Sequence, residues 1–172
     1  MMGGVMRWNL WLFLVRRSLY VENDIRFTEG LNMGEDMMVM MKLFICAGKV
    51  GIVHRPFYHY RQSNPESLTK IYSQEHIIQV ANNVYEVEKY VNASAYADSL
   101  IEFIPFLKLN IKLPLLITDD KSHYEQWLEC FPEANCYVMN NKLLPLRTRI
   151  IQWMAVKRYF ILLRLYYRTV FK

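Results

Sequence analysis

The segment that most constrains the fold of this chain is residues 37–47, which are apolar at every position except Lys42. A helix that is apolar on all sides must be surrounded by other elements, so this segment predicts a helix at the centre of a core. The methionine side chains that recur along it are flexible enough to fill irregular gaps. The 172 residues are sufficient for such a core, because a chain of this length buries roughly 70% of its unfolded surface.

Short strands are expected beside this helix. Residues 50–53 and 57–60 flank Pro56 and are rich in β-branched and aromatic side chains, a composition typical of strands. The apolar residues 8–20, which precede the central helix, predict a further helix. The first third of the chain is therefore predicted to mix helices with strands.

The remainder of the chain is predicted to be helical. Residues 73–91 place apolar side chains at helical spacing, and residues 93–113 continue this pattern with a kink or division at Pro105. Asp119 or Asp120 is expected to cap another helix, because an aspartate in this position accepts hydrogen bonds from the first free backbone N–H groups. The predicted fold class is α+β and helix-rich, with short strands followed by a helical C-terminal region.

The positive charge of the chain is gathered at its C-terminal end. The net charge is +5, from 21 basic and 16 acidic residues, yet no acidic residue follows Glu133. The basic residues beyond that point are Lys142, Arg147, Arg149, Lys157, Arg158, Arg164, Arg168 and Lys172. Residues 146–171 contain no glycine or proline, so they predict one long helix within a basic C-terminal region, residues 143–172.

Two interpretations of this basic helix are open. At about 100° per residue, four basic side chains fall within roughly 80° of one another: Lys157, Arg164, Arg168 and Lys172. Such a helix suits the surface of an anionic membrane, with its basic side chains toward the headgroups. In the alternative interpretation, the apolar side packs on the body of the protein and the charges are only solvated. No nucleic-acid partner is expected, because no recognisable binding motif accompanies the charge.

The first candidate for chemistry is the acidic pair that follows Gly34. Glu35 and Asp36 stand directly before the predicted central helix, where the helix dipole favours an ionised carboxylate. An ionised and fixed Asp36 could take the proton from an incoming hydroxyl as a general base. The structural alternative is that the aspartate caps the helix.

The second candidate is the sequence Tyr58-His59-Tyr60-Arg61. On an extended segment His59 and Arg61 share one face, while the two tyrosines share the other. A neutral imidazole can bind a divalent metal ion, and an arginine can pair with a phosphate. The structural alternative for His59 is an ordinary hydrogen-bonded residue within a strand.

Four motifs occur in order around these candidates. Residues 11–19 begin with tryptophan and end in Arg-Arg-Ser-Leu, and residues 25–36 read Ile-x-Phe-x-Glu-Gly-x-Asn-x-Gly-Glu-Asp. Residues 47–50 read Ala-Gly-Lys-Val, and residues 56–69 fit Pro-x-Tyr-x-Tyr-Arg-x-Ser followed by Ser-x-Thr. Together they make about residues 8–70 resemble the C-terminal half of the catalytic domain of family 2 glycosyltransferases, which build bacterial surface glycans.

This resemblance implies an inverting transfer of a sugar from a nucleotide-sugar donor to a glycan or lipid-linked acceptor, on a GT-A fold. Asp36 would be the catalytic base toward the acceptor hydroxyl, and Glu35 would shape the acceptor pocket. His59 would lie near the donor diphosphate and its Mg²⁺ or Mn²⁺ ion, as a metal ligand. Arg61 would contact the diphosphate or close a loop over it, and Trp11 would belong to the substrate-binding residues.

The chain also departs from the family pattern. Phe13 stands where the family usually has a lysine, two residues after the tryptophan. The family binds its metal through an acidic Asp-x-Asp motif in a preceding nucleotide-binding region, and this sequence contains no Asp-x-Asp. We therefore expect a partial GT-A fold without its donor-binding half.

This interpretation divides the chain into an acceptor-side half of a catalytic domain, residues 1–70, a helical region, residues 71–142, and the basic helix, residues 143–172. Half a domain with exposed sheet edges is expected to need oligomerisation. The three cysteines form no Cys-x-x-Cys pair, which predicts reduced thiols in a cytoplasmic protein. The basic helix predicts a position at the inner face of the membrane. The alternative functions are a non-catalytic remnant or interaction module, or a peripheral membrane-binding protein that acts through its tail.

Overall fold

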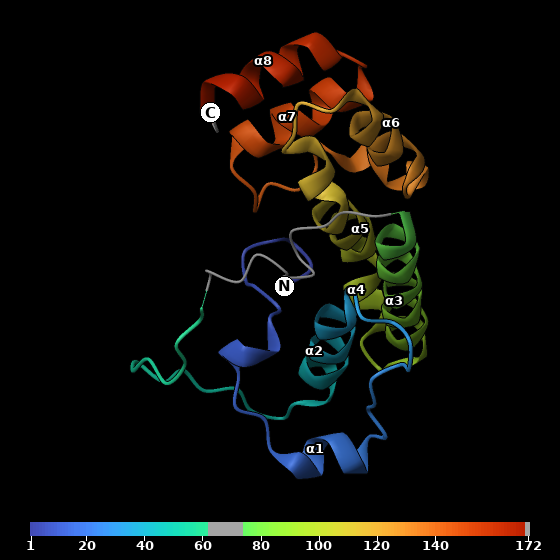
Figure 1. The fold of residues 1–172 in the computed structure, drawn as a ribbon. Coiled ribbons are helices and arrows are strands. Elements are labelled where there is room, and N and C mark those ends of the chain that lie inside the picture. The colour runs from blue at the N-terminus through green and yellow to red at the C-terminus, as the bar shows by residue number, and fades with distance from the viewer. Residues whose placement is uncertain (62–73, 171–172) are drawn as a thin grey trace. The chain divides into compact units, whose positions relative to one another are not determined.

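A computed structural model describes residues 1–61 and 74–170 of the chain (Figure 1). Contacts divide it into two compact units: Trp8–Ala97 forms one, and Met1–Arg7 together with Asp98–Lys172 forms the other. Helices make up the regular structure of both units, and no strand occurs in the residues described. The functional division at residues 70 and 142 stays a prediction.

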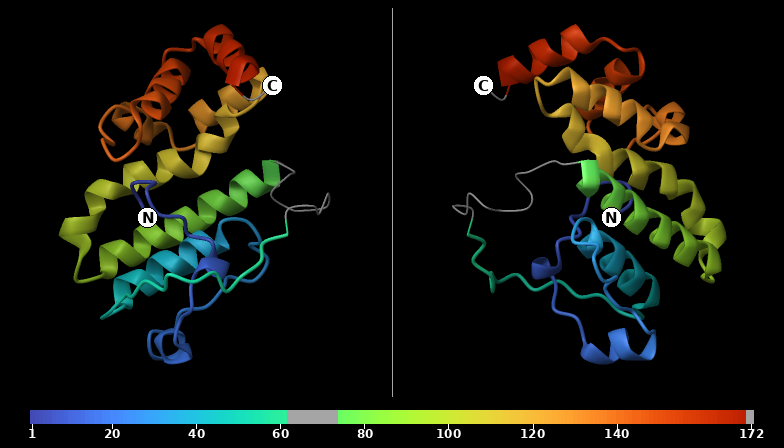
Figure 2. Two further views of the ribbon diagram at one scale, coloured as in Figure 1. Left: turned by 90° about the vertical axis from the view of Figure 1, so that its left-hand side faces the viewer. Right: turned by 45° about the vertical axis from the view of Figure 1, so that its right-hand side comes forward.

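The unit Trp8–Ala97 is built around two long helices. It contains the short 3-10 helix η1 (Leu10–Leu12), then α1 (Arg17–Glu22), α2 (Glu35–Cys46) and α3 (Gln74–Ala93). Helices α2 and α3 pack against each other and lie side by side in all the ribbon views (Figures 1 and 2). This pair forms the core of the unit.

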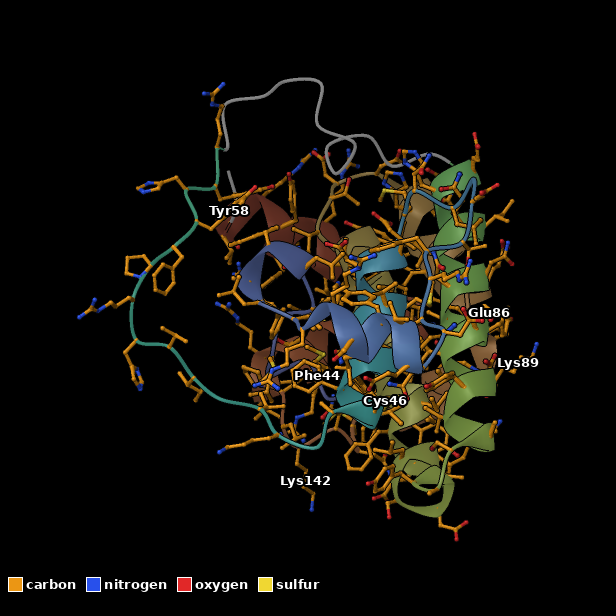
Figure 3. The ribbon with its side chains drawn as sticks, turned by 90° about the horizontal axis from the view of Figure 1, so that it is seen from below. Phe44, Cys46, Tyr58, Glu86, Lys89 and Lys142 are labelled. Atoms are coloured by element: carbon orange, nitrogen blue, oxygen red, sulfur yellow. The ribbon has the colours of Figure 1, made fainter. Side chains whose placement is uncertain are left out.

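The interface between α2 and α3 follows from their sequences. Consecutive residues of α2 are buried, which confirms the central helix predicted from its apolar run. Helix α3 contributes a valine stripe with helical spacing, Val80, Val84, Val87 and Val91. Where α2 ends, Cys46 Sγ lies 2.9 Å from the Tyr90 hydroxyl, and Figure 3 shows Cys46 and Glu86 on the two neighbouring helices.

The predicted strands are wrong, and with them the α+β class. Residues 50–61 are extended and exposed, with Ile52 at 83% and Phe57 at 68%, and they join no β ladder among the described residues. Strand-type residues favour an extended backbone, but a strand forms only where a neighbouring strand accepts its hydrogen bonds. The partial GT-A fold, which requires a sheet, is not what residues 1–61 and 74–170 form.

The helix predicted over residues 8–20 forms only in part. Only η1 and α1 form, and Phe13 between them has an extended backbone, with φ −125° and ψ 142°. Helices η1 and α1 are therefore two separate elements and not parts of one helix.

The second unit is a cluster of shorter helices. In chain order these are α4 (Ala97–Leu100), η3 (Ile101–Phe103), α5 (Ile104–Lys112), η4 (Leu113–Leu116), α6 (Lys121–Glu129), η5 (Pro132–Tyr137), α7 (Leu146–Val156) and α8 (Phe160–Val170). Two predictions are confirmed here. Pro105 stands in the first turn of α5, where proline is tolerated, and the Asp120 carboxylate caps α6 by accepting from Ser122 N at 2.9 Å.

A buried lysine, Lys112, ties the end of α5 to the end of α6. Its ammonium group donates to the carbonyl oxygens of Trp127 at 3.1 Å and Cys130 at 2.6 Å, and to Asn135 Oδ1 at 2.6 Å. These carbonyls belong to the C-terminal end of α6, where a helix attracts positive charge. Burial nevertheless lowers the pKa of Lys112 to about 8.

The single C-terminal helix that the sequence predicts is instead two helices, α7 and α8. Arg158 has a left-handed backbone, with φ 57°, and its N–H donates to Ala155 O at 2.9 Å. Tyr159 N donates to Met154 O at 2.9 Å, which completes a Schellman motif. The Trp153 and Tyr159 rings also meet edge to face, 5.7 Å apart. The chain therefore turns between α7 and α8 without a glycine.

No helix within residues 1–61 and 74–170 combines the length and the apolar character that crossing a membrane requires.

Candidate functional site

The turn into α2 sets the position of the acidic pair. Gly34 has a left-handed backbone, with φ 81°, a conformation that glycine adopts without strain. A Cβ atom at this position would lie 3.4 Å from Val80 Cα, so α3 passes close behind the turn. The side chains of α3 also fasten the loop, because Asn83 Nδ2 donates to Met33 O at 2.8 Å and Asn32 N donates to Gln79 Oε1 at 2.9 Å.

Asp36 does not cap its own helix. The residue at the cap position is Gly34, and no side chain caps α2, so the capping interpretation of the aspartate is wrong. Asp36 Oδ2 instead accepts a hydrogen bond of 3.1 Å from the backbone N–H of Leu10, at the start of η1. The carboxylate is therefore held by a distant part of the chain.

The surroundings of Asp36 carry a second carboxylate and a phenol. Glu35 is half-buried, and its pKa is raised by burial and by the negative charge of Asp36, against a lowering effect of its backbone hydrogen bond. The pKa of Tyr20 is raised by burial and, secondarily, by Asp36. Both effects mean that protons near Asp36 are held more tightly than in water.

Trp11, the residue after Leu10, contacts the Tyr58-His59-Tyr60-Arg61 segment. The indole of Trp11 stacks on the Tyr60 ring, with centroids 4.9 Å apart and planes at 7°, and on the Tyr58 ring at 5.2 Å and 23°. We call these three rings the aromatic platform. Its tyrosines are about half exposed, at 55% for Tyr58 and 49% for Tyr60. Helix η1 thus lies between Asp36 and the extended segment.

The structure does not join His59 and Arg61 to this group. Tyr58 and Tyr60 contact Trp11, whereas no contact of His59 or Arg61 with Asp36, Glu35 or Trp11 is found within the part of the chain that the structure describes. Both are exposed. Figure 3 shows Tyr58 on this segment, apart from the Phe44 and Cys46 side chains of α2. Asp36, Glu35 and Trp11 therefore form one local group, and His59 and Arg61 lie outside it.

A metal site is not formed by the residues that the structure describes. In residues 1–61 and 74–170, no three histidine, cysteine, aspartate or glutamate side chains gather closely enough to hold a metal ion. The His59 imidazole alone does not amount to a site for Mg²⁺ or Mn²⁺, which prefer several oxygen ligands. The Ser-x-Thr part of the last motif falls in residues 62–73, outside the described residues.

Several residues that contact or position the acidic pair were not predicted from the sequence. The Leu10 N–H and the Tyr20 ring carry no sequence signal, because they meet Asp36 only through the fold. Asn83 did leave a signal. It is a fully buried amide within the valine stripe of α3, and a buried amide has to find a hydrogen-bond partner. Tyr58 and Tyr60 were placed on one face, although the partner of that face could not be named.

Comparisons with known proteins give one partial similarity. The chain is 34% identical over 64 residues to the "Uncharacterized glycosyltransferase EpsJ" of Bacillus subtilis (strain 168). These residues are 37% of this chain and 18% of that protein, so the chain matches only a small part of its relative. No family model matches the chain. No solved structure matches it either.

Proposed function

We propose that this chain is the acceptor-side part of a glycosyltransferase of the family 2 type, in which Asp36 is the catalytic base. The observation that carries the proposal is the placement of the Asp36 carboxylate, held at 3.1 Å by Leu10 N next to the exposed aromatic platform. The partial similarity to a protein named as a glycosyltransferase supports the same activity. The chain spans 18% of that relative, so the complete reaction is part of the proposal.

The chemistry assigned to Asp36 follows from its position. Inverting sugar transfer needs a carboxylate that removes the proton of the acceptor hydroxyl as that oxygen attacks the anomeric carbon. The Leu10 N–H occupies one side of Oδ2, and Asp36 lies in the first turn of α2. The other carboxylate oxygen is then available to the acceptor. Glu35, whose pKa is raised, would hold the acceptor's other hydroxyls.

The aromatic platform is the surface on which we place the acceptor sugar. The C–H groups on one face of a pyranose ring pack well against aromatic rings. Trp11 fixes the two tyrosine rings by stacking, while about half of each tyrosine remains exposed. Leu10 and Trp11 are adjacent in η1, so a sugar on the platform is within reach of the Asp36 region.

His59 and Arg61 are assigned to the donor in this proposal. Both side chains are exposed, and the guanidinium of Arg61 could pair with a diphosphate. When bound, Mg²⁺ or Mn²⁺ would neutralise the charge of the departing diphosphate. The described residues do not form a site for that ion, so the acceptor side of the reaction is the part that the structure supports.

The test separates acceptor binding from transfer. Saturation-transfer NMR measures binding of a panel of oligosaccharides to the full chain, and radiolabelled nucleotide sugars with Mn²⁺ measure transfer to the sugars that bind. We expect Asp36→Asn to keep acceptor binding, because the amide oxygen can still accept from Leu10 N. Transfer should fall by roughly 100-fold or more, as for the loss of a general base.

Two further variants make the test specific. Trp11→Ala should abolish acceptor binding, because it removes the centre of the platform. Asp24→Asn is the matched control: this aspartate is 80% exposed and pairs with Arg26 at the surface, so it should change neither measurement. Undiminished transfer by Asp36→Asn would refute the base, and a wild-type chain that binds no sugar would refute the acceptor-side role.

A further inference from the structure

The C-terminal helices α7 and α8 carry a concentration of positive charge that the proposed transfer reaction does not use. Eight basic residues and no acidic residue follow Glu133. Arg168 Nε lies 3.7 Å from Asp119 Oδ2, and Arg149 donates to the neutral Met139 carbonyl at 3.2 Å, while Arg147, Arg158 and Arg164 are exposed. Most of the positive charge on these helices therefore faces solvent.

One side of α8 is used to pack the helix on its own unit. Leu163 is 1% exposed, and the Phe160 ring lies 5.5 Å from the Tyr124 ring of α6. The apolar residues on this side of α8 therefore pack within their own unit, as the second interpretation of the basic helix expects. The opposite side of α8 faces solvent.

The outward side of α8 is apolar over most of its width and basic along one edge. Ile161 is 78% exposed, Leu162 51% and Leu165 54%, although a stable surface helix usually buries side chains of this kind. Arg164 and Arg168 are exposed on the same side, because they lie three residues from Ile161 and Leu165 respectively. The apolar and the basic side chains therefore share one face and do not oppose each other.

Helix α7 and the turn also carry exposed apolar and basic side chains. Leu146, Ile150 and Trp153 are spaced by three or four residues on α7, and they are 54%, 41% and 38% exposed. Lys157 and Arg158 follow in the Schellman turn, and both are exposed. Helices α7 and α8 pack against each other, as Figures 1 and 2 show, so they present a hairpin of basic and apolar side chains.

We infer that this hairpin docks on the surface of an anionic phospholipid bilayer. Ile161, Leu162 and Leu165 would enter the region between headgroups and acyl chains, while Arg164 and Lys157 would contact lipid phosphates. The argument for lipid is charge complementarity. A second copy of this chain would bring an equally basic hairpin against the first, and like charges would repel. Docking of this kind is independent of the proposed sugar transfer.

The experiment is vesicle co-sedimentation of the full chain. One set of vesicles is pure phosphatidylcholine, and the other contains about one-third phosphatidylglycerol. We expect binding to the anionic vesicles only, and weaker binding at a physiological ionic strength of about 0.15 M than at low salt. The double variant Lys157→Gln with Arg164→Gln should weaken binding by about 10- to 30-fold, because each of these two residues adds to the electrostatic attraction between the chain and the anionic bilayer.

Matched variants separate the two parts of the surface. Ile161→Ser with Leu165→Ser removes apolar side chains that are mostly exposed, so the fold should survive while binding falls. Arg16→Gln with Arg17→Gln removes the same charge from an exposed pair in the other unit and should leave binding unchanged. Far-ultraviolet circular dichroism checks that each variant is folded.

Three outcomes would overturn the inference. The first is equal binding to neutral and anionic vesicles. The second is an equal loss of binding in the Arg16 and Arg17 control, which would show a general effect of net charge. The third is a lipid-free dimer, detected by analytical ultracentrifugation, that the Ile161 and Leu165 variant dissociates while its vesicle binding stays unchanged. That result would assign the surface to a second copy.

Discussion

The side-chain amide of Asn83 donates a hydrogen bond of 2.8 Å to the backbone carbonyl of Met33, across 50 residues of sequence. This bond fixes the loop that turns into α2 against the middle of α3. Gln79, one helical turn earlier, accepts from Asn32 N at 2.9 Å, so the loop is held at two successive residues. The position of Glu35 and Asp36 therefore depends on α3 as much as on α2.

Replacement of Asn83 by alanine should destabilise this unit. Asn83 is fully buried, and its removal would leave the Met33 carbonyl without its partner, at a cost of about 1–3 kcal/mol in the free energy of unfolding. Urea denaturation measures the change. Asn82→Ala is the matched control, because Asn82 is the exposed neighbour on the same helix and should change stability by less than about 0.5 kcal/mol. Equal effects of the two variants would contradict the role of the bond.

Gly34→Ala should cost about 1–2 kcal/mol of stability, because an alanine must adopt the left-handed backbone at φ 81°. The added Cβ would make ordinary contact with Val80, at 3.4 Å from its Cα, so backbone strain accounts for the loss. Gly48→Ala tests this explanation. Gly48 has no left-handed φ and no atom within 4 Å of an added Cβ, so its replacement should be neutral or slightly stabilising. Urea denaturation of both variants compares them directly.

Local signals predicted the elements that local interactions determine. The apolar run of α2 and the Asp120 cap of α6 were found because each depends on residues a few positions apart. The predicted strands at 50–53 and 57–60 failed because a strand also requires a partner, and the partner is not encoded in the segment itself.

The same distinction separates what was found of the site from what was missed. Sequence reasoning selected Asp36, and the structure places it where it contacts Leu10. That contact joins two residues that are 26 positions apart in the sequence, and Trp11 is still farther from Tyr58 and Tyr60 in the sequence. Neither could be derived from residue spacing. His59 was selected for the chemistry of its side chain; it is exposed in the structure, and its role as a metal ligand stays a prediction.

Lys112 gives the chain a specific dependence of stability on pH. Burial lowers its pKa from 10.5 to about 8, so between these values the unfolded chain binds more protons than the folded chain. The free energy of unfolding should therefore rise with pH through this window, by at most about 3 kcal/mol from this group. Below pH 8 the cost of the buried charge is fully present.

Comparison of wild type with Lys112→Met by urea denaturation at several pH values isolates this contribution. The difference in unfolding free energy should move in favour of wild type as the pH rises from 8 toward 10.5. Lys121→Met, which removes an exposed lysine of the neighbouring helix, controls for the loss of one positive charge. If the difference in unfolding free energy between wild type and Lys112→Met stayed constant over this pH range, burial would not lower the pKa of Lys112 in the folded chain.

Arg158→Gly distinguishes the observed hairpin from the single helix that the sequence predicts. Arg158 has a left-handed backbone at φ 57°, which costs a residue with a Cβ about 1–2 kcal/mol, so glycine should stabilise the chain by about 1 kcal/mol. In one continuous helix the same substitution would destabilise the chain by about 1 kcal/mol. The control is Arg164→Gly in the interior of α8, which should destabilise either arrangement. Urea denaturation followed by far-ultraviolet circular dichroism gives the sign. A loss of stability at position 158 equal to that at position 164 would mean that the turn between α7 and α8 does not form, because only the left-handed turn gives glycine an advantage over arginine at this position.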